Sequence, residues 1–546
     1  MQFILPFIIA MALTMTGLPL LGRLAGKWRI VDHPGVRKIH STPIPRVGGL
    51  AMAFAVLLAA VLSIHLAWPD IWFLIAAGVI VLFGAIDDRF DSDYRVKLVG
   101  QLTAVCIVMW MGDVRVQSVI MDDRLALPGW VSVPLTLVFL VGVTNAINLA
   151  DGLDGLAGGT TFLSLCAVAL LSSIGGAGPA TALALAFAGA VLGFLRFNTY
   201  PASVFMGDAG SQLLGFAVGV LAVRVTQSET SEIAATIPIL LLALPILDTL
   251  SVMVQRIGEG RSPFSADKNH IHHKLLALGF DHHEAVMVIY AVQAMLFVFA
   301  YLLRFEADWL VLLVVSVIFL TFLAVFQIAT RTGWQFRVRP DGVGALPVSR
   351  LLSLLRRLSL LPRLCQWAIA GSVGLYAAIT VVDGVSMSMD FKILIVALLV
   401  LMLGSLVIRR LAPLSLIEKA ALYVTVTLLV YLDAVLLPVG RTMSIVGWIA
   451  VAIAGVATAV RLRFYSDRRF ELTSLDLLVL FMALVVPSLP GTLSLPHGGA
   501  LAIAKLVVLF YALEILISGA EKNSTGLRIA AVAVLAGLTL RPLLIL

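Results

Sequence analysis

The sequence stretch VSVPLTLVFLVGVTNAINLADGLDGLAGG, residues 131–159, runs from an apolar segment directly into a cluster of polar residues. Asn148, Asp151 and Asp154 recur every three residues, so on helical turns they would lie roughly along one face. Ionisable side chains at the margin of a membrane segment are costly, and they usually mark a site rather than packing. The stretch therefore predicts a membrane-spanning helix that ends at a small enzyme site.

The composition is that of an integral membrane protein. Of the 546 residues, 60% are hydrophobic and only 13% are charged, and the mean hydropathy is +1.05. A soluble chain of this length would carry far more charge. Apolar runs of about 17–22 residues recur along the chain, each long enough to cross a bilayer of ~30 Å. We predict an all-α polytopic integral membrane protein with about eleven spans before residue 330 and about seven after it. The first eleven spans are centred near residues 12, 58, 79, 105, 140, 166, 187, 217, 243, 294 and 318.

The rest of the composition limits the alternatives. The first apolar run, residues 3–22, is not followed by a small-residue cleavage site, so we expect a retained span and not a signal peptide. The three cysteines are scattered, which excludes a disulfide framework and a cysteine-based metal site. The net charge of +7 resides in loops between spans, which is typical of a membrane protein and gives no reason to expect a nucleic-acid partner.

Basic residues gather in alternate loops, at residues 23–46, 89–97, 256–274 and 331–363. By the positive-inside rule these loops are cytoplasmic and the N-terminus lies outside. The polar blocks that carry chemistry all fall on the cytoplasmic side. We therefore expect them to converge on one site at that membrane face.

Two blocks carry carboxylates suited to a hard cation. In AIDDRFDSDYRVK, residues 85–97, Asp87 and Asp88 are adjacent at the end of a predicted span. In FNTYPASVFMGDAGSQ, residues 197–212, Asp208 lies between two glycines just before a span, and Phe205 is placed to offer a flat face to a base. Mg²⁺ prefers oxygen ligands and commonly takes one or two carboxylates with phosphate oxygens. Each block alone also fits a plain acidic loop or turn.

The glycines of the opening stretch allow two interpretations. Gly152, Gly155, Gly158 and Gly159 permit close approach of the backbone to a ligand, and equally permit close helix packing. Their interleaving with Asn148, Asp151 and Asp154 favours the ligand.

A fourth block, RIGEGRSPFSADKNHIHHKL at residues 256–275, is long, polar and basic. Arg256, Arg261 and Lys268 suit a diphosphate. The histidines His270, His272 and His273 also admit a zinc interpretation, but no cysteine or glutamate completes a familiar ligand spacing. Phosphate or sugar contact is favoured over zinc and over a plain solvated loop.

Taken together, these blocks resemble those of the polyprenyl-phosphate N-acetylhexosamine-1-phosphate transferases. DDRFD, NAINLADGLDGLAGG, VFMGDAGS and SPFSADKNHIHH match the family's blocks in order and spacing, and PIPRVGGLAM at residues 43–52 resembles its N-terminal signature. The resemblance covers roughly residues 1–330. It implies transfer of a sugar-1-phosphate from a UDP-N-acetyl sugar to undecaprenyl phosphate, with release of UMP and with Mg²⁺, or alternatively Mn²⁺, as cofactor. It also implies a multi-pass protein of the bacterial inner (cytoplasmic) membrane.

The resemblance also implies roles for individual residues. Asp208 and Asp151 would hold the metal, and Asp87 and Asp88 would be catalytic, as base or as organisers of the metal. Phe205 would stack on uracil. The substrate-binding set is Asn148, Asp154, Phe205, Asn198, Arg256, Arg261, Lys268, His270, His272, His273 and Arg46.

The histidine block distinguishes branches of the family. The branch that uses UDP-MurNAc-pentapeptide for peptidoglycan carries three consecutive histidines followed by phenylalanine, whereas this chain has His270-Ile271-His272-His273. That favours the branch using UDP-GlcNAc or a related N-acetyl sugar for O-antigen, common antigen or other envelope glycans. Direct attack by the lipid phosphate is preferred over a two-step route through a phosphorylated Asp87 or Asp88.

Residues 331–546 lie outside the resemblance. We predict a transferase core at 1–330, a basic cytoplasmic linker with an interfacial helix at 331–364, and an additional transmembrane module at 365–546. Packing or oligomerisation, for example as a homodimer, is the leading role for that module, ahead of partner docking. A lipid or sugar transporter is the main rival for the whole chain, but transporters place ionisable groups near the bilayer midplane, and here they cluster at one face.

Overall fold

The computed structural model describes residues 4–32, 43–120, 124–175, 178–228, 231–262, 269–332, 361–383, 389–408, 414–436, 442–465, 499–519 and 524–544. The chain divides into two compact units, Met1–Arg339 with Thr473–Leu475, and Pro340–Leu472 with Asp476–Leu546. Most of the predicted linker at 331–364 lies outside the described residues. The assignment of a separate role to each part of the chain remains a prediction.

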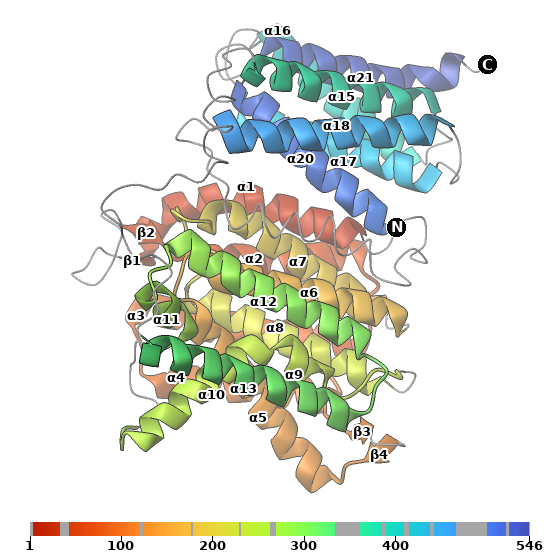
Figure 1. Cartoon of the computed structure of the whole chain (residues 1–546). Coiled ribbons are helices and arrows are strands. Elements are labelled where there is room, and N and C mark those ends of the chain that lie inside the picture. Colours follow the sequence, from red (N-terminus) through yellow and green to blue (C-terminus); the bar gives the residue numbers. More distant parts are fainter. Residues whose placement is uncertain are drawn as a thin grey trace. The chain divides into compact units, whose positions relative to one another are not determined.

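The first unit is helical, with two short β-hairpins (Figure 1). Its helices are α1 (Ile4–Trp28), α2 (Gly48–Ser63), α3 (Trp68–Phe90), α4 (Tyr94–Trp110), α5 (Gly129–Ala150), α6 (Leu156–Ile174), α7 (Gly178–Asn198), α8 (Gly207–Gln227), α9 (Ile237–Leu241), α10 (Ala243–Gly258), α11 (Ile271–Ala277), α12 (His282–Leu302) and α13 (Asp308–Thr332). The antiparallel pairs are β1 (Val31–Asp32) with β2 (Ile44–Pro45), and β3 (Ser118–Ile120) with β4 (Arg124–Ala126).

Nine described helices are long and apolar enough to cross a membrane, and eight of them belong to the first unit. The chain is therefore a multi-pass membrane protein. The predicted total of about eighteen spans is larger, partly because several apolar helices are short. Helix α2 has 16 residues and α4 has 17.

One predicted span, centred near residue 243, is interrupted. The chain forms α9, breaks at Leu242 and resumes as α10. Pro245 has no N–H to donate to the carbonyl of Leu241, which removes one hydrogen bond of a continuous helix. Figure 1 shows α10 leaning away from the bundle.

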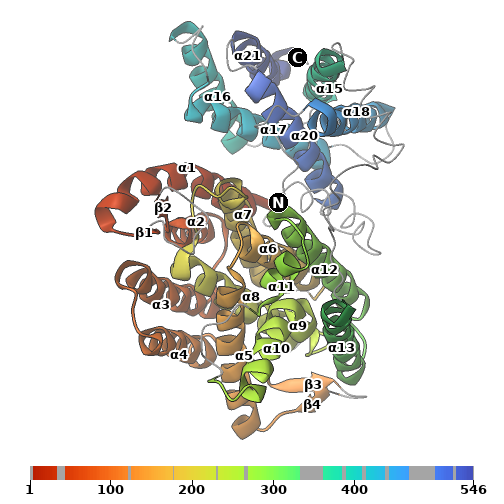
Figure 2. The same cartoon turned by 60° about the vertical axis from the view of Figure 1, so that its left-hand side comes forward.

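Helix α8 is the centre of the first unit. It packs against α2, α3, α5, α6 and α7 (Figure 2). In its 18-residue apolar segment 94% of the residues are buried, compared with 11% in that of α13. Its alanines and glycines let neighbouring helices approach closely, as is usual where helices pack in a membrane. The start of α8 is consequently held by the ends of several other helices.

The second unit is a separate helical bundle. Its described helices are α15 (Leu361–Asp383), α16 (Met389–Ile408), α17 (Leu416–Leu436), α18 (Thr442–Tyr465), α20 (Gly499–Gly519) and α21 (Thr525–Leu544). A core of leucine, valine, isoleucine and alanine side chains joins all six, with Met402, Leu429 and Leu535 among its buried members. Within this core lie two buried ion pairs, Asp433–Lys505 and Glu418–Arg528.

Candidate active site

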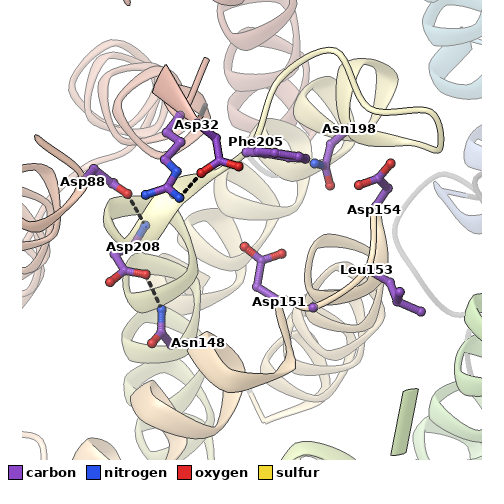
Figure 3. A pocket seen from close by; sticks show the side chains of 12 residues that line it. Asp32, Asp88, Asn148, Asp151, Leu153, Asp154, Asn198, Phe205 and Asp208 are labelled. Carbon is purple, nitrogen blue, oxygen red and sulfur yellow. Dashed lines mark hydrogen bonds and ion pairs between the residues drawn. The ribbon is translucent and has the colours of Figure 1, made fainter. Parts of the chain in front are cut away.

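The ends of α3, α5 and α7 meet the starts of α6 and α8 around one cavity of about 290 Å³. Figure 3 shows polar side chains from these ends pointing toward the same space. The lining residues are Asp32, Arg46, Asp88, Asn148, Asp151, Gly152, Leu153, Asp154, Asn198, Phe205, Gly207 and Asp208. Four sequence blocks far apart in the chain thus contribute to one cavity.

Asp88 holds the start of α8. Its carboxylate oxygens accept hydrogen bonds from the backbone N–H groups of Asp208, at 2.8 Å, and Ala209, at 3.0 Å. These are donors that a helix N-terminus leaves unsatisfied. Gly207 has a φ of +68°, and a side chain there would meet the Asp88 carboxylate. Asp88 therefore fixes the position of Asp208.

Asp208 lies in a network with two other side chains. The Asn148 amide donates to Asp208 Oδ1 at 2.9 Å and to Ser211 Oγ at 2.7 Å. The ammonium of Lys97 forms ion pairs with Asp208 and with Asp87, at 2.8 Å from Asp87 Oδ2. The second oxygen of Asp87, Oδ1, is buried with no hydrogen-bond partner among the described residues. Lys97 thus stands between two carboxylates that the sequence predicts at a cation site.

From the sequence, Lys97 is predicted only as one of the basic residues of a cytoplasmic loop. The structure places it in the first turns of α4, which follows α3 after a short break. A lysine ten residues after Asp87, at the start of the next helix, was the available signal.

The DGLDG segment departs from the expected helical face. Helix α5 ends at Ala150, so Asn148 lies on the helix while Asp151 and Asp154 lie in a turn. Gly155, with a φ of +81°, donates its N–H to Asn198 Oδ1 at 2.9 Å and accepts from the Tyr290 hydroxyl at 2.6 Å. The glycines therefore shape a loop that continues along the cavity.

Two residues tie this loop to the VFMGD segment. Asn198, which is buried, donates to the carbonyl of Val204 at 3.0 Å while accepting from Gly155. Asp154 accepts from the N–H of Ala202 at 2.9 Å. Both predicted substrate-binding residues therefore also brace the cavity wall.

Negative charge is in excess in the cavity. Burial and then the nearby carboxylates of Asp208, Asp154 and Asp88 raise the pKa of Asp151 to about 7, against the opposing effect of Arg46. A carboxyl group in such surroundings gains most from a bound cation.

The N-terminal signature lies along the VFMGD segment. Phe205 donates its N–H to the carbonyl of Pro45 at 2.8 Å, and its own carbonyl accepts from Gly48 at 3.0 Å. This pairing brings both Phe205 and Arg46 to the cavity lining, where Arg46 forms an ion pair with Asp32. Asp32 was not predicted from sequence.

The histidine block packs behind the DGLDG loop. His272 is buried, and it lies against Gly152 so closely that a side chain at that position would collide with its ring. Burial, and then the neighbouring His273 and His270, lower the pKa of His272 to about 4. The rings of His272 and His273 are 4.3 Å apart between centroids. His272 is thus a neutral imidazole at the back of the cavity wall.

The basic residues of this block are more dispersed than expected. Arg256 is buried at the end of α10, and Arg261 is partly exposed and paired with Glu259 at 2.8 Å. Neither is among the described residues that line the cavity, nor are the three histidines. Lys268 lies outside the described residues.

A multi-pass helical bundle whose helix ends enclose one acidic cavity is typical of an integral membrane enzyme. Within that class, the chain belongs to the polyprenyl-phosphate N-acetylglucosamine-1-phosphate transferases of glycosyl transferase family 4. Residues 71–226 match the model of "Glycosyl transferase family 4".

Three relatives illustrate the similarity. A probable undecaprenyl-phosphate N-acetylglucosaminyl 1-phosphate transferase of Bacillus subtilis is 33% identical over 340 residues, which cover 62% of this chain and 94% of the relative. The decaprenyl-phosphate N-acetylglucosaminephosphotransferase of Mycolicibacterium smegmatis is 37% identical over 303 residues, covering 49% and 73%. The undecaprenyl-phosphate alpha-N-acetylglucosaminyl 1-phosphate transferase of Escherichia coli K12 is 30% identical over 323 residues, covering 57% and 87%.

Proposed function

We propose that the protein transfers N-acetylglucosamine-1-phosphate from UDP-GlcNAc to undecaprenyl phosphate and releases UMP. The observation that carries this proposal is the network of Asp208, Lys97, Asp87 and Asn148 at the start of α8, beside a cavity lined by Phe205 and Asp154. Similar proteins are named for N-acetylglucosamine transfer to a polyprenyl phosphate. The block His270-Ile271-His272-His273 supports the same sugar.

The carboxylates fit a divalent cation, Mg²⁺ or Mn²⁺. No three His, Cys, Asp or Glu side chains in the described ranges form a preassembled metal site. Yet Asp87 Oδ1 is buried without a hydrogen-bond partner in the part of the chain that the structure describes, and the Lys97 ammonium lies where a cation could lie, between Asp87 and Asp208. We propose Asp208 and Asp151 as the oxygen ligands. A bound Mg²⁺ would neutralise phosphate charge and stabilise the UMP leaving group.

The chain's own residues provide the positioning. Asn148 donates a hydrogen bond to the side chain of Asp208, and Asp88 accepts one from the backbone N–H of Asp208. The Lys97 ammonium provides a positive charge that can attract the phosphates of the donor. Arg46 provides a second positive charge in the cavity lining. Phosphoryl transfer depends mainly on such positioning and charge neutralisation.

We favour direct attack of the lipid phosphate on the sugar-bearing phosphorus. A phosphate monoester has its second pKa near ~6, so strong general-base help is not needed. Any residual proton is better accepted by Asp87, because both oxygens of Asp88 already accept backbone hydrogen bonds. Substantial activity of Asp87→Asn at raised pH would support this base role and would exclude a covalent Asp87 intermediate.

For the donor, we propose that uracil stacks on Phe205, that the nucleotide lies along Asp154 and Asn198, and that the diphosphate points toward Asp208. The lining order in Figure 3, from Asp154 and Asn198 to Asp208, supports this direction. We place the cavity on the cytoplasmic face of the bacterial inner membrane with the N-terminus outside, on the basis of the basic loops.

One assay tests the proposal. UMP release is measured from UDP-GlcNAc, undecaprenyl phosphate and Mg²⁺ with the wild type, Asp208→Ala and the control Asp113→Ala, which alters an exposed aspartate. We expect magnesium-dependent release by the wild type and the control, and none above background by Asp208→Ala. A panel of UDP-sugars determines the donor. Absence of release with every UDP-N-acetyl sugar would overturn the proposal.

A further inference from the structure

A buried carboxylate on α10 lies behind the histidine block. Asp248 is 4% exposed and His270 is 6% exposed. Asp248 Oδ2 lies 2.9 Å from His270 Nδ1, and Oδ1 accepts the backbone N–H of Ile271 at 2.8 Å. Both oxygens of one carboxylate are thus committed to two consecutive residues that lie 22 and 23 positions later in the chain.

Each contact fixes something different. Ile271 is the first residue of α11, so its N–H is one of the donors that a helix start leaves unsatisfied. The second contact fixes the His270 ring. An ionised carboxylate only accepts hydrogen bonds, so the proton of this bond must reside on His270 Nδ1. A neutral His270 then presents Nε2 as an acceptor, and a charged one presents it as a donor.

The two contacts of Asp248 affect the cavity indirectly, through the position of α11. The ring of His270 is parallel to that of His272, with an interplanar angle of 6° and centroids 5.9 Å apart. His272 in turn lies against Gly152, which lines the cavity next to Asp151. A displacement of the start of α11 would therefore move the residue that backs the DGLDG loop.

We propose that Asp248 is a positioning residue of this enzyme: it selects the Nδ1–H form of His270 and anchors the start of α11, so that the histidine block keeps a fixed orientation toward the donor. Asp248 does not line the cavity and acts through His270. The orientation of the histidine block toward the donor rests on the proposed function. The tautomer of His270 and the anchoring of α11 do not depend on that function.

The substitution Asp248→Asn separates the two contacts. The asparagine carbonyl can still accept from Ile271 N–H, while its NH₂ group faces His270 Nδ1 and requires that nitrogen to accept, which moves the proton to Nε2. Asp248→Ala removes both contacts. We expect Asp248→Asn to unfold near the wild-type temperature and Asp248→Ala to unfold at a lower temperature.

The change of the His270 tautomer in Asp248→Asn should also lower enzymatic activity. For histidines that ligate a metal, loss of the carboxylate that orients the ring costs about 10–100-fold in metal affinity or activity. We expect a loss of activity of that size in Asp248→Asn, and no comparable loss in the matched control Asp113→Asn. In a His270→Ala background, Asp248→Asn should add no further loss, because the two residues act as one unit. Wild-type activity in Asp248→Asn, or full additivity with His270→Ala, would overturn the proposal.

A spectroscopic readout does not depend on activity. ¹⁵N NMR of histidine-labelled full-length protein in nanodiscs, with the His270 signal assigned through His270→Ala, reports which ring nitrogen carries the proton. We expect Nδ1–H in the wild type and Nε2–H in Asp248→Asn. A wild-type His270 with its proton on Nε2 alone would overturn the inference even if the enzyme is active. Conversely, a wild type that releases no UMP but shows the expected tautomers would overturn only the proposed function.

Discussion

The cavity of the first unit and the core of the second unit place charge among apolar helices in opposite ways. In the first unit, five of the twelve residues that line the cavity are aspartates and one is an arginine. In the second unit, the described buried charges occur in pairs: Asp433 with Lys505, and Glu418 with Arg528 at 2.7 Å. The first arrangement carries an excess of negative charge, whereas the second is neutral by itself.

The paired charges of the second unit are also well supplied with other contacts. Tyr376 donates to Asp433 at 3.0 Å, and the Lys505 ammonium lies 4.2 Å from the centre of the Trp448 ring. Arg528 donates to Ser405 at 3.0 Å and to Ser524 at 2.8 Å. Removing one partner of such a closed, neutral cluster leaves an uncompensated buried charge, whereas ionisable side chains gathered at the margin of membrane segments usually mark a ligand site. The comparison therefore predicts activity effects in one unit and stability effects in the other.

The largest expected effect is that of Lys97→Met. The substitution leaves Asp87 and Asp208 facing each other without the cation between them, and removes the positive charge beside Asp208, toward which we propose the diphosphate points. We expect kcat/KM for UMP release to fall about 10²–10³-fold. Raising the Mg²⁺ concentration should recover part of the loss, and Lys97→Arg should lose less. A Lys97→Met enzyme within tenfold of wild type would show that the acidic cavity needs no lysine.

The second prediction makes the matching change in the other unit. Lys505→Met leaves Asp433 buried without its counter-charge, and breaking a buried pair costs about 3–5 kcal/mol. We expect a value near the lower end of that range, because Tyr376 still donates to Asp433. The double substitution Lys505→Met with Asp433→Leu should restore most of the stability, since neither charge remains. Unfolding in detergent measures both.

The activity of the double variant provides the control. Per folded molecule, we expect it to release UMP at the wild-type rate. A large loss of activity at normal stability would contradict the comparison and would give the second unit a part in the reaction.

Much of the fold followed from hydropathy. Each of the eleven apolar centres predicted before residue 330 lies within a helix. The break between α9 and α10 was missed, although Pro238 and Pro245 flank it. Apolar runs identify helices because the membrane imposes their length, but they do not locate an interruption within a helix.

The site was harder to predict in detail. Asp88, Asn148, Asp154 and Asp208 are predictable from the sequence, and the structure brings them to one cavity. Lys97 and Asp248 are not, because their partners depend on which helix ends dock together. Asp87 and Asp88 look equivalent in the sequence, whereas only Asp88 accepts the N–H groups of α8. Neighbouring residues on a helix point in different directions, and the sequence does not show which of them faces the partner.

A smaller effect is expected for Gly207→Ala. The φ of +68° is disfavoured for residues with a side chain, and the new methyl group would meet the Asp88 carboxylate. We expect a loss of stability of about 1–3 kcal/mol. We also expect reduced kcat, since Asp208 is the next residue. The matched change Gly371→Ala in the second unit, where the glycine has open space around it, should have little effect on either.

The smallest predicted effect is a pH dependence of stability from His272. Its pKa is lowered to about 4 because the ring is buried, and Nδ1 has no partner among the described residues. Below pH ~6.5 His272 therefore binds a proton in the unfolded chain but not in the folded protein. As a result, the contribution of His272 to the free energy of unfolding is complete above pH ~6.5 and declines as the pH falls toward 4. Between pH 7 and pH 6 the loss amounts to about 0.7 kcal/mol. It should disappear in His272→Asn, measured by chemical unfolding at the two pH values. If the free energy of unfolding of that variant still falls by the same amount between pH 7 and pH 6, a group other than His272 titrates. Burial of His272 would then cost the first unit no more stability at pH 6 than the buried ion pairs cost the second.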